Sequence, residues 1–203
     1  MKSKSEIVEQ TRLAFDFIQK LYLETSYLVK EIEGILNEEN EKFIIGRPSG
    51  YGITSKSSTG LEAKHVPSWL LRKFAVFFVE EDITEIKGGT TNTKLSESLK
   101  VIYLRLLLDD PNVQAPTIYS GVFYDIEKNP GNSRFTKFEH FMTYLEYRDA
   151  KVFINPLKID HEGSYLSIKG KFIANNLYDI NDSEGIRKLI IQPTLKLYRS
   201  IKV

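Results

Sequence analysis

The sequence predicts one α+β domain over residues 1–203, with a twisted, mainly antiparallel sheet packed by a long N-terminal helix and a second helix near 134–148. Two observations lead to this fold class. Apolar residues recur at helical spacing over residues 5–37. The stretch 99–126 reads as two long strands joined by a loop that is too short for a parallel crossover. Residues 43–203 then supply a sheet of five to seven strands and one helix.

The N-terminal helix is expected over residues 5–37. Its apolar positions are spaced by three, four or seven residues: Ile7, Ala14, Ile18, Leu21, Leu28, Ile32 and Ile35. A straight helix of this length would measure about 50 Å, more than the ~30 Å diameter of a small domain. We therefore expect it either to kink, at Gly34, or to overhang the domain and pack on a second copy of the chain. The overhang predicts a homo-oligomer formed through this helix.

The remaining elements follow from shorter patterns. Before the second helix, strands are expected at 43–45, 72–79, 100–108 and 117–126, with 83–98 as an exposed polar connection. After that helix, strands are expected at 152–154, 165–174, 187–191 and 194–203, with a short helix from 183–185 as the alternative near the end. Residues 72–79 are apolar on both faces, which is typical of a central strand with cover on both sides. Pro193 predicts an edge or a bend.

Composition excludes several function classes. Lys and Arg (28) nearly balance Asp and Glu (27), so the net charge of +1 does not indicate a nucleic-acid partner. The absence of cysteine excludes a disulfide framework, thiolate catalysis and Cys-ligated metal sites. No apolar run approaches the ~20 residues that span a bilayer. We expect a soluble, cytoplasmic protein with no membrane contact.

The glycine-rich segment 46–60 is the first candidate ligand site. Its glycines and its Ser55-Lys56-Ser57 resemble a phosphate-binding loop only in part, because the second glycine of that motif and the helix after it are missing. An anion-contacting loop that uses Arg47, Tyr51 and Lys56 stays open beside an ordinary structural hairpin.

Tyr103 and Arg105 are the second candidate ligand site. In the strand 100–108 one face is purely aliphatic, and these two side chains share the other face. Tyr and Arg are enriched at binding surfaces. The alternative is that both residues lie beneath the N-terminal helix, with Arg105 paired to an acid such as Asp16 or Glu24.

Metal and catalytic signals are weak. Asp109 and Asp110 precede Asp125 and Glu127 at nearly the spacing of a nuclease-type metal site, but Glu127 adjoins Lys128 without the intervening residue of that pattern. The three histidines have no metal-binding spacing, so we expect no metal. The sequence identifies no catalytic residue and no cofactor.

Three function classes remain open. The chain is a non-catalytic binding or assembly module, an enzyme or nucleotide- or phosphate-ligand-binding protein that uses the 46–60 loop, or a metal-dependent nucleic-acid-processing protein. We favour the first.

Overall fold

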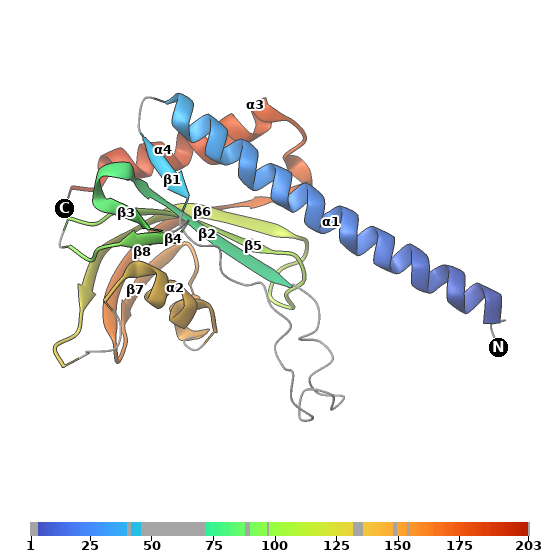
Figure 1. The fold of residues 1–203 in the computed structure, drawn as a ribbon, viewed down its shortest axis with the longest axis horizontal. Helices are drawn as coiled ribbons and strands as arrows, with labels where there is room; N and C mark the ends of the chain where they lie inside the picture. The colour runs from blue at the N-terminus through green and yellow to red at the C-terminus, as the bar shows by residue number, and fades with distance from the viewer. Residues whose placement is uncertain are drawn as a thin grey trace.

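The computed structural model describes residues 4–39, 42–45, 72–87, 90–96, 98–131, 136–147, 150–153 and 155–202. It confirms the α+β fold class: six antiparallel strands form one sheet in the order β1-β2-β5-β6-β8-β7, with helices on both faces (Figure 1). The strands are β1 (Phe43–Ile45), β2 (Lys73–Glu80), β5 (Val101–Leu107), β6 (Thr117–Lys128), β7 (Lys158–Glu162) and β8 (Leu166–Asn176). A separate hairpin consists of β3 (Thr84–Lys87) and β4 (Thr90–Thr93).

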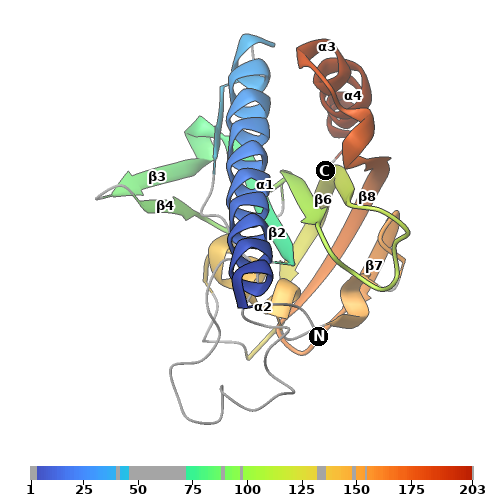
Figure 2. The same cartoon turned by 90° about the vertical axis from the view of Figure 1, so that its right-hand side faces the viewer.

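The helices form the two outer layers. The long ones are α1 (Lys4–Glu38), α2 (Phe138–Tyr147) and a C-terminal run of α3 (Ser183–Ile186), the π-helical turn η6 (Arg187–Ile191) and α4 (Gln192–Ser200). Short 3-10 turns are η3 (Glu81–Ile83), η4 (Ala150–Phe153) and η5 (Leu177–Asp179). Figure 2 shows α1 and α4 side by side over one face of the sheet, while α2 covers the opposite face in Figure 1.

Strand β5 lies between two cores, which explains why neither of its faces reads as solvent surface. All seven of its residues are buried. Ile102, Leu104 and Leu106 pack beneath α1 and α4. Val101 and Tyr103 face the other core, which includes Phe138 and Leu145 of α2. The predicted central strand, β2, is likewise buried on both faces through Ala75–Val79.

Helix α1 overhangs the sheet and does not break at Gly34. It runs unbroken from Lys4 to Glu38, and Figure 1 shows its N-terminal half projecting beyond the body. Its buried residues all belong to the second half: Thr25, Val29, Ile32, Ile35 and Leu36. Of the two expectations for this helix, a kink at Gly34 and an overhang, the structure shows the overhang.

The strands predicted at 187–191 and 194–203 are wrong, because the chain is helical from Ser183 to Ser200. Ile186, Ile190 and Leu195 are buried at helical spacing against the sheet. Asp182 caps the run by accepting a hydrogen bond from the N–H of Gly185 at 2.7 Å. Pro193 predicts an edge or a bend in a strand, but it lies within the helical run. The π-helical turn before it accommodates the proline, and in this turn the N–H of Gln192 bonds to the carbonyl of Arg187.

Three smaller predictions are also corrected. Part of the expected connection 83–98 is the β3–β4 hairpin, whose polar sequence concealed it. Residues 152–153 of the expected strand 152–154 belong to η4, because an apolar run this short does not separate a strand from a helical turn, and residue 154 lies outside the described residues. Strand β7 was missed because it is an edge strand with Ile159 as its one buried residue. The second predicted helix is α2, which begins at Phe138.

Candidate functional site

Tyr103 and Arg105 lie beneath α2 and not beneath the N-terminal helix. Both residues are buried, Tyr103 completely and Arg105 to within 9% exposure. The expectation that Arg105 pairs with Asp16 or Glu24 of the N-terminal helix is wrong, since side chains alternate along β5 and the face toward α1 carries Leu104 and Leu106. Its partner is an acid on α2.

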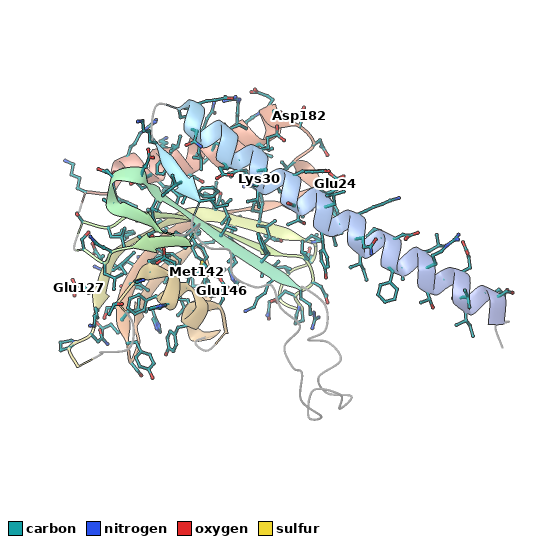
Figure 3. All side chains as sticks on the ribbon, viewed as in Figure 1. Glu24, Lys30, Glu127, Met142, Glu146 and Asp182 are labelled. Atoms are coloured by element: carbon teal, nitrogen blue, oxygen red, sulfur yellow. The ribbon has the colours of Figure 1, made fainter. Side chains whose placement is uncertain are left out.

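That acid is Glu146, whose side chain is 1% exposed. The hydroxyl of Tyr103 donates to its Oε1 at 2.8 Å, and Nε of Arg105 donates to both carboxylate oxygens at 3.1 Å. Nζ of Lys73 lies 3.6 Å from Oε2 and also donates to the main-chain carbonyl of Glu146. Figure 3 shows Glu146 on α2, on the underside of the sheet. The carboxylate thus joins two strands to the helix through charge-assisted hydrogen bonds.

A cavity of about 730 Å³ adjoins this cluster. Its floor includes Arg105 and Glu146, and its apolar walls include Leu145, Tyr119 and Phe153. The guanidinium carbon of Arg105 lies 4.0 Å from the centre of the Phe153 ring. This stacking fixes the plane of the guanidinium at the cavity wall.

The loop 109–113 forms the rim of the cavity. Asp109 bonds to Arg72, with Oδ2 at 2.7 Å from Nε, and Asp110 accepts hydrogen bonds from the main-chain and side-chain nitrogens of Asn112. These rim carboxylates already have partners. Arg105 differs, because its terminal nitrogens have no hydrogen-bond acceptor among the described residues.

The candidate ligand residues Arg47, Tyr51 and Lys56 lie outside the described residues. The structure therefore does not test whether the 46–60 loop contacts a ligand, and that hypothesis stays a prediction. Of the five candidate ligand residues, Tyr103 and Arg105 are the two that the structure brings together.

The acidic residues proposed for a nuclease-type metal site do not converge. Asp109 follows the end of β5 that pairs with Thr117, whereas Asp125 lies toward the other end of β6, roughly 25 Å away at ~3.3 Å per residue. Within the described part of the chain, no group of three His, Asp or Glu side chains is placed to hold a metal ion.

Asp125 instead takes part in a local ion pair at a bulge in β6. Its backbone has φ of 47°, and its Oδ2 accepts a hydrogen bond from Nζ of Lys169 at 2.9 Å. That hydrogen bond raises the pKa of Lys169 above its ordinary value. Burial, and then the charge of Asp125, raises the pKa of the neighbouring Tyr124.

The overhang of α1 is the second candidate site, and it is a surface. Large apolar side chains are exposed along it: Ile7, Val8, Leu13, Phe15, Phe17, Leu23 and Tyr27. Phe15 and Phe17 are 61% and 63% exposed. A groove of about 570 Å³ continues this surface between α1 and residues 177–186. At about 3.6 residues per turn the exposed apolar side chains lie all around the helix, with Ile7 on the side that continues the buried face and Leu13 and Leu23 turned away from it. Large apolar side chains exposed in this number are typical of an interaction site.

Sequence reasoning missed Glu146 and Phe153. A signal for Glu146 was present, because it lies four residues after Met142 and so falls beside the apolar face of its helix. A carboxylate at such a position requires a buried partner. Phe153 carried no comparable signal, since its neighbours suggested a strand.

No family model, curated protein or solved structure matches this chain, so its function is argued from its own residues. None of the described helices combines the length and the apolar character of a membrane-spanning segment.

Proposed function

We propose that the protein is a non-catalytic assembly module that forms a homo-oligomer through α1. The observation that carries this proposal is the continuation of the buried face of α1 into the overhang. Ile18 stands two heptads before the fully buried Ile32, and Ile7 stands four heptads before the buried Ile35. The same helix face is thus covered by the sheet in one half and uncovered in the other.

A second copy of the chain is the proposed partner. In a two-fold symmetric dimer the same patch meets itself, so one apolar face serves both subunits. Two such helices pair along apolar positions at heptad spacing. The overhang has this spacing at Ile7, Ala14 and Ile18.

The size of the overhang suits this arrangement. Residues 5–20 cover ~24 Å of helix axis, and half the surface of a cylinder ~10–12 Å wide is about 400 Å² per copy. Two copies, with part of the groove beside residues 177–186, approach the ~1,000 Å² at which specific interfaces begin. The same proposal places the protein in the cytoplasm, which the absence of cysteine suits.

Sedimentation velocity on the full chain tests the proposal. We expect the wild-type protein to sediment as a dimer or larger oligomer, and the variant Ile7→Glu/Ile18→Glu to sediment as a monomer, because four charges would enter the paired apolar faces. Both substitutions leave the buried half of α1 intact and introduce a good helix former.

The matched control is Leu13→Glu/Leu23→Glu. It adds the same charge to the same helix on the side turned away from the apolar face, so it should keep the wild-type sedimentation. A wild-type protein that is monomeric at every concentration tested would contradict the proposal, as would equal dissociation by both variants.

A further inference from the structure

We propose that the cavity beside Arg105 binds a small organic monocarboxylate with an aromatic or aliphatic body. The site lies under α2, on the face of the sheet opposite to α1, so this inference is independent of assembly through α1. It rests on three features of the cavity: a buried cation, apolar walls and nearby carboxylates.

The buried cation is Arg105, which is nine-tenths buried and lines the cavity. Only its Nε is engaged, by Glu146, and its terminal nitrogens have no acceptor among the described residues. A guanidinium presents five N–H donors in a fixed plane, and its free edge matches the two oxygens of a carboxylate. The Phe153 ring and Glu146 hold that plane in place before any ligand arrives.

The walls of the cavity favour an apolar ligand body. Phe153, Tyr119 and Leu145 lie around the guanidinium, and Leu107 extends the same side. A planar ring placed between Phe153 and Tyr119 would bury apolar surface at about 25 cal/mol per Å². The volume of about 730 Å³ is in the range of small-molecule sites.

The charge of the cavity favours one negative charge over two. The lining holds three cations, Arg72, Lys73 and Arg105, and three carboxylates, Asp109, Asp110 and Glu146. Arg72 pairs with Asp109 and Lys73 with Glu146, so the free edge of Arg105 can neutralise one negative charge, and the second charge of a phosphate ester would be poorly compensated in a partly desolvated space. A carboxylate brings the smaller charge and has the geometry that Arg recognises bidentately.

Isothermal titration calorimetry on the full chain tests the inference with 3-phenylpropionate, its neutral amide 3-phenylpropanamide, and phenyl phosphate. We expect saturable binding of 3-phenylpropionate, and at least about tenfold weaker binding of the amide, which lacks the charge. Phenyl phosphate should also bind more weakly. Absence of 3-phenylpropionate binding overturns the inference, as does equal binding of the amide.

The variant Arg105→Gln/Glu146→Gln removes the buried cation together with its buried partner, and Lys73, whose side chain is 33% exposed, keeps its hydrogen bond to the main-chain carbonyl of residue 146. It should weaken 3-phenylpropionate binding at least about tenfold. Arg187→Gln is the control, because Arg187 also pairs with glutamates but lies on the α1 side. Should the double variant fail to fold, Phe153→Leu tests the site by weakening the aromatic contact alone. Unchanged affinity in the folded double variant or in Phe153→Leu overturns the inference.

Discussion

Asn175 donates a hydrogen bond from its side-chain amide to the main-chain carbonyl of Leu189 at 2.9 Å. Leu189 stands four residues before Pro193, which has no N–H to give to that carbonyl. A side chain of strand β8 thus replaces the hydrogen bond that a proline removes from the C-terminal helical run. This bond joins the sheet to the helical run within its π-helical turn.

Asn175→Ala is therefore expected to destabilise the protein by about 1–3 kcal/mol, because it leaves the Leu189 carbonyl without a donor. In a Pro193→Ala background the cost should be smaller, since alanine restores an N–H within the helix. Urea unfolding of the four proteins in this double-mutant cycle gives the coupling between the two positions. Equal costs of Asn175→Ala in both backgrounds would show that proline is not the reason for the bond.

Removing one member of the Arg105–Glu146 pair is expected to cost about 3–5 kcal/mol, because the other charge then stays buried without its partner. Arg105→Gln/Glu146→Gln should cost less than the sum of the two single changes. Chemical denaturation of the four proteins measures this difference. Additive costs would mean that the two side chains do not interact in solution.

Asp125→Val is expected to destabilise the protein by about 1–3 kcal/mol, because a β-branched residue is strained at positive φ. Asp125→Asn should change stability little at this φ, since Asn tolerates the left-handed region. It should also lower the pKa of Lys169, because Asn keeps an oxygen acceptor for the hydrogen bond that Lys169 donates but removes the carboxylate charge that raises this pKa.

The pH dependence of this pair has a definite sign. The folded-state pKa of Lys169 is raised, so its contribution to stability is present below the unfolded-state pKa, about 10.4, and is lost as the pH rises through the folded-state pKa. The difference in unfolding free energy between wild type and Asp125→Asn should therefore shrink as the pH rises through the folded-state pKa of Lys169. Titration of Lys169 by NMR in both proteins measures the pKa, and an unchanged value in Asp125→Asn would contradict the prediction.

How far the sequence predicts this fold depends on whether local patterns and tertiary packing agree. The heptad positions of α1 and the alternation in β5 are patterns set by the element itself, and both were recognised. The consecutive apolar residues of Arg187–Ile191, with Pro193 after them, predict a strand. Its helical form is stabilised by contacts that are remote in the sequence: Ile186 and Ile190 pack against the sheet, and Asn175 donates a hydrogen bond to the Leu189 carbonyl.

The candidate site was predictable only in part for the same reason. The strand period placed Tyr103 and Arg105 on one face, which the structure confirms. It could not indicate which helix covers that face, because strand order and the side on which α2 packs are tertiary properties. The sequence therefore does not predict that Glu146 of α2 is the residue that pairs with Arg105 and orients it.

Gly34→Ala is expected to stabilise the protein by about 1 kcal/mol, because Gly34 lies inside an unbroken helix and alanine is the better helix former there. A Cβ added at Gly34 meets no atom within 4 Å, so no steric cost opposes the gain.

Gly121→Ala provides the contrast, since a Cβ there would lie 2.1 Å from the carbonyl oxygen of Lys171 and 2.7 Å from Cα of Phe172. These are main-chain atoms of the neighbouring strand β8, so relief requires β6 and β8 to separate, and we expect a cost of about 3 kcal/mol or more. Urea unfolding midpoints of the two variants should thus move in opposite directions from wild type, and a destabilised Gly34→Ala protein would indicate that α1 bends at this residue in solution.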